Sequence, residues 1–356
     1  MSNLSAHPFD DLSVDHVQYC TGDLRAAVDW LEGGYGLPTF ARSAPGAPSP
    51  ALGIGRERIR LLVTQPTPAD GIGSRYVQRH GDGVADIALR VNDAAAALDA
   101  ALSRGAELLR PLQQRDGVTT ATVLGFGDVA HTLVERVPGG DDEVLPGLLP
   151  VAPTRDRDAP RLHEIDHFAV CLPAGELDST VEFYERVFGF DMIFTEHIVV
   201  GTQAMNSKVV QSRSGKVTLT MLEPDPRHDP GQINQFLERH GGAGVQHMAF
   251  STDDIVDAVS TLEARNQEFL TTPDTYFQLV EERLVLVKHS IADLRKLNVL
   301  VDEDHHGQLY QIFARSVHPR GTYFNEIIER VGARTFGSSN IKALYQAVEL
   351  QRSRDI

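Results

Sequence analysis

A chain of 356 residues is long enough to form two domains, each with a buried core of its own. Its 49 acidic and 33 basic side chains give a formal net charge of −16, which repels phosphate groups and argues against nucleic acid as a partner. The chain has no run of about 18 apolar residues and begins without the basic and apolar segment of a signal peptide, so we expect a cytoplasmic protein that does not enter a membrane.

The first half of the chain reads as an alternation of short strands and helices. Alternating apolar residues over 14–20 predict a strand, and a helical pattern follows over 24–31. In chain order, the remaining predicted elements are strands at 51–54 and 58–64, a helix at 74–80, a strand at 84–90, a helix at 93–104, and strands at 118–124 and 131–137.

Residues 138–160 are rich in proline, glycine and charge and show no sustained period. This composition is typical of a linker, so we expect an N-terminal domain over residues 1–137 and a C-terminal domain over residues 161–356. The second half is predicted to contain a strand at 164–171, a helix at 178–187, strands at 191–200, 207–211 and 216–223, a helix at 230–240, a strand at 245–251, a helix at 253–264, an insertion near 273–297, strands at 298–301, 308–314 and 323–330, and a helix at 339–350.

An internal repeat relates the two halves. Residues 76–89 read YVQRHGDGVADIAL and residues 236–250 read FLERHGGAGVQHMAF, and the two match when one residue is inserted. A strand, a helix and about three strands recur twice in each half. This order predicts an α+β fold of paired βαβββ modules, in which each pair curls its sheet into an open barrel around a cavity.

Three residues of the second half could meet inside such a barrel. They are His167, His247 and Glu326, which are separated by 80 and 79 residues (247 − 167 and 326 − 247). Two imidazoles and one carboxylate on one face of an ion are the ligand set of non-haem Fe(II) oxygenases. The pattern therefore indicates an iron site in the second half.

The matching positions of the first half are His16, Asp86 and Thr132, so only the first histidine is kept. This difference predicts a degenerate metal site in the N-terminal domain. The residue types alone leave other interpretations open. A lone histidine on an apolar strand is more often a hydrogen-bonded core residue, and Glu326 could face outward as we expect Glu329 to do.

Several motifs of the chain resemble the 4-hydroxyphenylpyruvate dioxygenase family, over about residues 12–351. These motifs are IDHFAV, QINQFL followed by GAGVQHMAF, EHIVVGTQAMNS, DEDHHGQLYQIF and YFNEIIERVGARTFGSSNIKALY. The resemblance implies a vicinal-oxygen-chelate fold and an Fe(II) ion held by His167, His247 and Glu326. It also implies an enzyme that takes 4-hydroxyphenylpyruvate and O2, decarboxylates the keto acid oxidatively, and needs no separate 2-oxoglutarate.

The chain departs from the dioxygenase pattern at two places beside the expected position of the substrate ring. Ile341 stands where those dioxygenases carry phenylalanine, and Thr220 to Leu222 stand where they carry a Pro-x-Asn pattern. These differences change the space and the polar groups beside the ring, and about 1.4 kcal/mol is enough for a tenfold change in rate. We therefore expect benzylic hydroxylation to 4-hydroxymandelate. Ile341 could equally be a core residue of an amphipathic helix.

The resemblance also implies the residues of the substrate pocket. These candidates are Ser207, Thr220, Leu222, Gln232, Gln246, Gln311, Phe313, Phe324, Asn340, Ile341 and Tyr345. Gln246 and Gln311 could instead face solvent, and Phe313 and Phe324 could simply fill the barrel. We expect no catalytic group beyond the metal ligands.

Two other functions stay open at this point. One is a dioxygenase that attacks the ring and forms homogentisate from the same substrate. The other is a metal-free binding module for an aromatic acid on the same fold, against which the two histidines and Glu326 argue. We also expect a homodimer.

Overall fold

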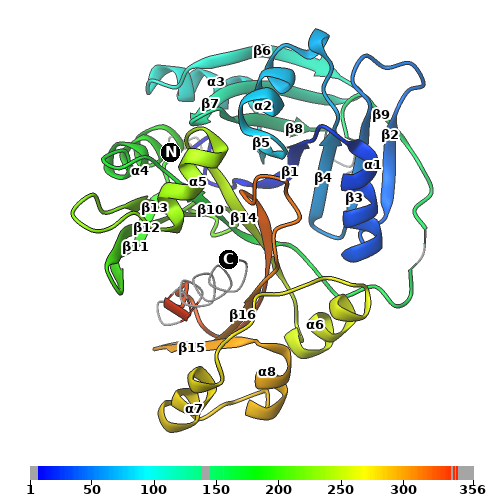
Figure 1. Ribbon diagram of the computed structural model, residues 1–356. Coiled ribbons are helices and arrows are strands. Elements are labelled where there is room, and N and C mark those ends of the chain that lie inside the picture. Colours follow the sequence, from blue (N-terminus) through cyan, green and yellow to red (C-terminus); the bar gives the residue numbers. More distant parts are fainter. Residues whose placement is uncertain (1–6, 138–144, 155, 338–339, 341, 344–356) are drawn as a thin grey trace, which may run out of the picture.

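The computed structural model describes residues 7–137, 145–154, 156–337, 340 and 342–343. Within these residues the strands form two curved sheets, one from each half of the chain, with helices packed along them (Figure 1). The first sheet has the strand order β6-β7-β8-β5-β1-β4-β3-β2-β9 and the second has the order β11-β12-β13-β10-β14-β17-β16-β15. The α+β class and the two curled sheets that we predicted are confirmed.

The elements of the first half run from β1 to β9. They are β1 (Ser13–Cys20), α1 (Leu24–Val28), the π-helical turn η1 (Asp29–Gly34), β2 (Thr39–Ser43), β3 (Ala51–Arg56), β4 (Ile59–Thr64), the short 3-10 turn η2 (Pro68–Asp70), α2 (Ile72–His80), β5 (Gly83–Arg90), α3 (Ala94–Ser103), β6 (Leu108–Arg115), β7 (Val118–Phe126), β8 (Val129–Arg136) and β9 (Leu148–Pro150).

The elements of the second half run from β10 to β17. They are β10 (Ile165–Cys171), α4 (Leu177–Phe188), β11 (Asp191–Val200), β12 (Gln203–Gln211), β13 (Thr218–Pro224), α5 (Gln232–His240), β14 (Gly244–Ser251), α6 (Ile255–Ala264), α7 (Asp274–Arg283), α8 (Ile291–Leu297), β15 (Leu300–Asp304), β16 (Gly307–Phe313) and β17 (Phe324–Val331).

Four βαβββ modules account for most of these elements. The first half contains β1-α1-β2-β3-β4 and β5-α3-β6-β7-β8, and the second contains β10-α4-β11-β12-β13 and β14-α6-β15-β16-β17. In each half the two modules join through an antiparallel pair, β1 with β5 and β10 with β14. The last strand of the second module, β8 or β17, lies parallel to the first strand of that module. Strands β10, β14 and β17 are therefore neighbours, although they are far apart in the sequence.

A carboxylate fixes the helix that follows the first strand in two of the modules. Glu135 accepts a hydrogen bond from the backbone N–H of Ala94 (2.9 Å), and Glu329 accepts one from the backbone N–H of Ile255 (2.8 Å). These N–H groups lie in the first turns of α3 and α6, where no partner exists within the helix. The predicted outward direction of Glu329 is wrong, because its side chain is buried by this role.

Side chains of both halves share the largest apolar core. The ring of Tyr19 lies edge-on to the ring of Tyr323 at 5.3 Å between centroids, and the ring of Tyr35 lies 5.9 Å from that of Phe250. Helices α2 and α5 also meet, because His80 Nδ1 lies 2.8 Å from the carbonyl oxygen of His240. No helix among the described residues combines the length and the apolar character needed to cross a membrane.

Three strands of the first sheet, β2, β6 and β9, were not predicted. Most side chains of β6 are exposed, so this strand lacks the apolar alternation by which strands are recognised. Strand β9 lies inside the segment expected as a linker and pairs with β2, so the first sheet extends into that segment. The insertion near 273–297 contains α7 and α8. Of the helix predicted over 339–350, only Asn340, Lys342 and Ala343 are described, and they are helical.

Candidate metal centre

Two histidines and a glutamate from three neighbouring strands point to the same side of the second sheet. Strand β10 places His167 opposite Ala249 of β14, and β17 places Glu326 opposite the same alanine. His247 precedes Ala249 by two residues and therefore faces the same side, because successive side chains of a strand alternate. All three side chains are buried. We call His167, His247 and Glu326 the metal cluster.

The distances within the metal cluster suit a bound divalent cation. The Nε2 atoms of His167 and His247 lie 3.5 Å and 3.1 Å from Oε2 of Glu326. Ligand atoms that bind one ion at about 2.1 Å and at right angles lie about 3.0 Å apart. Among the described residues, the ligand atoms of this group all lie within 4.8 Å of one another.

Buried polar atoms without hydrogen-bond partners also favour a bound cation. Oε1 of Glu326 and Nδ1 of His247 have no hydrogen-bond partner within the described part of the chain. A buried carboxylate oxygen without a partner is costly, and a cation beside it would remove that cost. The two imidazoles and the carboxylate, with an unpartnered carboxylate oxygen, therefore fit a metal ion. The assignment of these residues as iron ligands stays a prediction.

A carboxylate and an arginine hold His167 in place. Oδ1 of Asp166 lies 2.9 Å from Nδ1 of His167, which leaves Nε2 for the centre of the cluster. Arg330 donates two hydrogen bonds of 2.8 Å, from Nε and Nη2, to the two oxygens of Asp166. Arg330 also donates to the carbonyl oxygen of Thr335 (2.7 Å) and lies over the ring of Phe336. The orientation of His167 is thus coupled to the segment that follows β17.

Charges and burial set the protonation states that a cation would meet in the cluster. Burial disfavours an ionised Glu326, but the charge of His167 and the hydrogen bonds from His167 and His247 together outweigh it and lower the pKa of Glu326. Burial lowers the pKa of His247 and keeps it neutral. Burial also opposes a charged His167, yet the carboxylates of Glu326 and Asp166 raise its pKa to about 9. Cation binding would therefore displace a proton from His167.

A cavity of about 40 Å³ adjoins the metal cluster. Space of this size accommodates little more than one water molecule, since a water occupies about 30 Å³ in the liquid. Besides the cluster itself, the described residues that line it are Ala169, Thr220, Leu222, Gln232, Ile233, Gln246, Gln311, Phe313, Ile328 and Phe336. An aromatic substrate can enter only if some of these side chains move.

Six of the predicted pocket residues line this cavity, namely Thr220, Leu222, Gln232, Gln246, Gln311 and Phe313. Phe324 does not line it but stacks on His247 with ring centroids 4.9 Å apart. Ser207 is buried opposite Leu222, and Asn340 accepts a hydrogen bond from the hydroxyl of Tyr276 (2.8 Å). Ile341 and Tyr345 lie outside the described residues.

Sequence reasoning did not identify the roles of Asp166, Arg330 and Phe336. The first two had a usable signal, because Asp-His and Glu-Arg recur at matching places in both halves. Phe336 lies in the motif ARTFGSSN, and its ring stands edge-on to His167 at 5.3 Å. The sequence offers no periodic pattern from which that contact could be predicted.

Fold and cluster together define the class of protein. The chain matches the Glyoxalase/Bleomycin resistance protein/Dioxygenase superfamily over residues 164–280, in agreement with the vicinal-oxygen-chelate fold. It also matches the N-terminal part of hydroxyphenylpyruvate dioxygenase over residues 56–145.

Whole-chain relatives give the family. The chain is 32% identical to 4-hydroxyphenylpyruvate dioxygenase of Caenorhabditis elegans, over 96% of this chain and 92% of the relative. It is also 32% identical to the enzyme of the same name from Dictyostelium discoideum, over 95% and 97%. This chain belongs to the 4-hydroxyphenylpyruvate dioxygenase family, whose members are non-haem iron enzymes.

Solved structures agree with this placement. A triple mutant of 4-hydroxymandelate synthase from Streptomyces coelicolor superposes with a TM-score of 0.86 at 42% identity, over 96% of this chain and 98% of that one. A fusion protein of a xylose isomerase-like barrel and a 4-hydroxyphenylpyruvate dioxygenase matches with a TM-score of 0.74 at 22% identity and shows the fold alone.

Proposed function

We propose that this chain is an Fe(II)-dependent oxygenase that converts 4-hydroxyphenylpyruvate and O2 to 4-hydroxymandelate and CO2. In this proposal residues 161–356 are the catalytic domain, residues 1–137 a structural domain, and residues 138–160 the connection between them, which adds β9 to the first sheet. The observation that carries the proposal is the convergence of two imidazole Nε2 atoms on one carboxylate oxygen of Glu326. We further propose that the protein forms a homodimer, is cytoplasmic and serves antibiotic biosynthesis.

The metal cluster would hold the ion through His167, His247 and Glu326. With three protein ligands, the ion would keep coordination positions for substrate and O2. When bound, Fe(II) supplies the electrons for O2 activation and a Lewis-acidic point for the keto acid. Asp166 keeps Nε2 of His167 directed at the centre, and Glu326 supplies the negative charge that retains the cation.

Polar atoms around the cavity would orient the substrate. Oγ1 of Thr220, Nε2 of Gln232 and Oε1 of Gln311 are buried without a hydrogen-bond partner in the described chain. Buried groups of this kind gain most from a ligand that pairs with them, so they suit the hydroxyl and carboxylate of the substrate. Phe313 and Phe336 would pack against its ring and exclude water.

Product choice depends on which substrate carbon the protein presents to the metal. Leu222 is buried beside the cavity and offers no amide to the ring, and it stands where the homogentisate-forming enzymes carry asparagine. With Ile341, this favours a ring position that exposes the benzylic carbon. The similarity to 4-hydroxymandelate synthase also supports this outcome. The names of the curated relatives favour the alternative, homogentisate formation.

Product analysis tests the proposal directly. Iron-loaded protein is incubated with 4-hydroxyphenylpyruvate in air, and the product is identified by mass and retention time. We expect 4-hydroxymandelate, and homogentisate as the main product would overturn the assignment. Oxygen uptake that persists after a chelator removes the iron, or that is absent with iron present, would support a different activity or a binding module instead.

Two variants test the basis of selectivity. Ile341→Phe and Leu222→Asn each restore the residue type of the homogentisate-forming enzymes, so we expect each to raise the share of homogentisate by about tenfold, the effect of about 1.4 kcal/mol. Ile233→Val, a conservative change elsewhere in the cavity wall, is the matched control and should keep the product ratio. An unchanged ratio in both test variants would remove these two residues from the explanation.

A further inference from the structure

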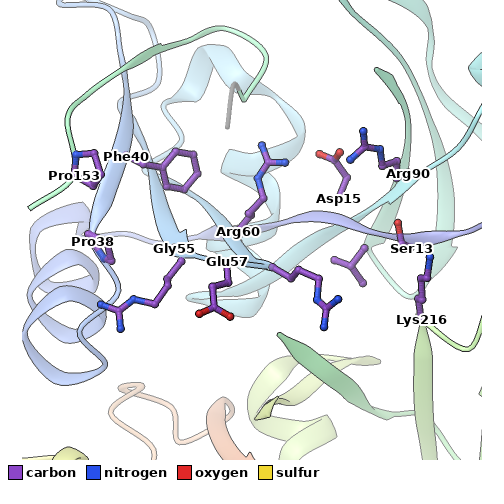
Figure 2. A pocket seen from close by; sticks show the side chains of 13 residues that line it. Ser13, Asp15, Pro38, Phe40, Gly55, Glu57, Arg60, Arg90, Pro153 and Lys216 are labelled. Atoms are coloured by element: carbon purple, nitrogen blue, oxygen red, sulfur yellow. The ribbon is translucent and has the colours of Figure 1, made fainter. Parts of the chain in front are cut away.

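A second and much larger cavity lies away from the metal cluster. Its volume is about 570 Å³, which is within the range of small-molecule sites, about 300–1,000 Å³. It forms where β1 and the β3–β4 turn of the first sheet approach the turn between β12 and β13 (Figure 2). We call it the anion cavity for the reasons that follow.

Cationic side chains dominate the lining of the anion cavity. Five of them, Arg56, Arg58, Arg60, Arg90 and Lys216, face two acidic ones, Asp15 and Glu57, an excess of three positive charges (5 − 2). The whole chain has a formal net charge of −16, so this excess runs against the overall composition. A concave surface lined by one sign of charge concentrates ligands of the other sign.

Both acidic residues of the lining already have partners. Asp15 is buried, and its oxygens accept hydrogen bonds of 2.6 Å and 2.8 Å from Arg136, which lies behind the cavity wall. Glu57 contacts Nδ1 of His163 at 2.9 Å, and in Figure 2 its side chain points away from Arg60. Arg58 pairs with Glu164 outside the lining (2.8 Å), and Arg60 and Arg90 also have partners, so Arg56 and Lys216 are the cations on which the inference depends.

Neither Arg56 nor Lys216 is paired with a carboxylate within the described residues. Nη1 and Nη2 of Arg56 donate to the carbonyl oxygens of Pro160 and Gly36, each at 3.3 Å, and these neutral acceptors fix the side chain without neutralising it. Lys216 forms no ion pair within the described part of the chain and is exposed at the cavity rim. Both groups can therefore approach an added anion.

Apolar residues complete the cavity. Phe40 lies on the same side of the sheet as Arg60 and Arg90 in Figure 2, and Pro38 and Pro153 line the wall beside it. Guanidinium groups bind carboxylate and phosphate oxygens in pairs, while a ring and proline faces pack against a carbon skeleton. The combination suits an organic anion better than a bare inorganic one.

We infer that the anion cavity is a binding site for a small organic anion that carries carboxylate or phosphate groups. The site is separate from the metal cluster and does not depend on the reaction proposed above. Both halves of the chain contribute to its wall. Ser13 of the first half forms an isolated β-bridge with Lys216 of the second, and the backbone N–H of Arg58 donates a hydrogen bond to the carbonyl oxygen of His163 (3.0 Å). A bound anion would therefore hold the two halves together and raise the unfolding temperature.

Calorimetric titration of the iron-loaded protein tests this inference. The probes are inorganic phosphate, phenyl phosphate and tricarballylate, each at the same ionic strength set with sodium chloride. We expect at least one organic probe to bind with a stoichiometry of one and a Kd below about 1 mM. Binding of phenyl phosphate alone would identify phosphate as the preferred group, and binding of tricarballylate alone would identify carboxylate.

Charge variants decide where the probe binds. Lys216→Glu and Arg56→Gln should each weaken binding by about tenfold, since close charge pairs contribute at least about 1.5 kcal/mol. Arg25→Glu is the matched control, because it makes the same charge reversal on exposed α1, and it should leave the Kd unchanged. His247→Ala should also leave it unchanged.

Several results would overturn the inference. One is that none of the probes binds the wild-type protein. Another is that Lys216→Glu weakens binding no more than Arg25→Glu does, which would indicate a general effect of net charge. A third is loss of binding in His247→Ala, which would place the probe at the metal cluster.

Discussion

In the first sheet Asp15 accepts two hydrogen bonds from Arg136 and contacts Nδ1 of His16 at 2.7 Å. In the second sheet Asp166 does the same with Arg330 and His167. The two halves thus keep an identical arrangement of carboxylate, arginine and imidazole. Because, within the described residues, a possible metal cluster surrounds this arrangement in the second half alone, the arrangement is part of the framework of the fold and not a mark of catalysis.

The halves differ at the two positions beside this arrangement. In the first, Asp86 accepts hydrogen bonds from both the backbone N–H and the hydroxyl of Thr132, so the two residues satisfy each other. In the second, His247 and Glu326 leave Nδ1 and Oε1 without partners in the described chain. Two substitutions therefore separate a self-contained polar pair from a group that still needs a ligand.

The interiors of the two barrels differ as well. Leu145 and Leu148, from the segment around β9, form a cluster with Ala41 and Ala51 inside the first sheet. A Cβ added to Gly53 would lie only 3.0 Å from Leu145 Cδ1. The cavity beside Asp86 has a volume of only about 20 Å³. The first barrel is filled by its own chain, whereas the second keeps unpartnered polar atoms around its cavity.

Replacing a histidine of the second half should have the largest effect on iron content and oxygen uptake. His247→Ala removes one of three predicted ligands, so we expect iron content and oxygen uptake to fall by more than the 10–100-fold typical of groups that only support a ligand. The metal-free variant should stay folded with a moderately lower free energy of unfolding, because the buried ring of His247 also stacks on Phe324 and contacts Glu326. Metal analysis, oxygen uptake and urea unfolding measure these quantities.

His16→Ala is the matched control in the first half. It removes a histidine from the same arrangement, so iron content and turnover should stay near those of the wild type. Equal loss of iron in the two variants would contradict a functional difference between the halves.

One substitution made in both halves should have two different results. Arg330→Gln removes the partner of Asp166 and loosens His167, so iron affinity should fall by about 10–100-fold. Arg136→Gln leaves the buried carboxylate of Asp15 without its counter-charge and should lower the free energy of unfolding by about 3–5 kcal/mol while iron affinity is unchanged. Competition with a chelator dye gives the affinity, and urea unfolding gives the stability.

A fall in iron affinity in Arg136→Gln as large as in Arg330→Gln would show that stability alone controls metal retention. Unchanged affinity in both would remove Arg330 as a positioning residue. Restoration of affinity by Arg330→Lys, which keeps the charge but loses the fork of two donors, would assign the effect to charge and not to geometry.

The repeat made the framework of this protein predictable. Strand alternation, helix patterns and the repeated segment predicted the α+β class and the βαβββ modules. The convergence of His167, His247 and Glu326 was one of several interpretations of the residue types, and the family resemblance favoured it. Strand β6 was missed because its exposed side chains carry no alternation, and β9 because its composition is that of a linker. Such strands form only because a neighbouring edge supplies hydrogen bonds, which a local pattern does not contain.

The surroundings of the cluster were less predictable than the cluster. The pairing of Asp166 with Arg330 spans 164 residues and could be found only by asking why both halves keep the same two residue types. The anion cavity depends on which cations already have partners. Arg58 is paired with Glu164, while Arg56 donates to backbone carbonyls, and no spacing in the sequence distinguishes the two.

The smallest expected effect concerns acid stability of the first half. Burial acts to raise the pKa of Asp15, but hydrogen bonds from Arg136 and His16 hold it well below its usual range. A group whose pKa is lowered by folding stabilises the fold above its unfolded pKa, about 3.9, and that stability is lost as the pH falls below it. Asp15→Asn should therefore lower the free energy of unfolding at pH 7, and its difference from the wild type should shrink between about pH 4 and pH 2, because Asp15 of the unfolded chain takes up a proton there while Asp15 of the folded chain stays ionised. Urea unfolding of both proteins across this range measures the difference, and a constant difference would mean that the Asp15 carboxylate stabilises the first half by its shape and hydrogen bonds and not by its charge.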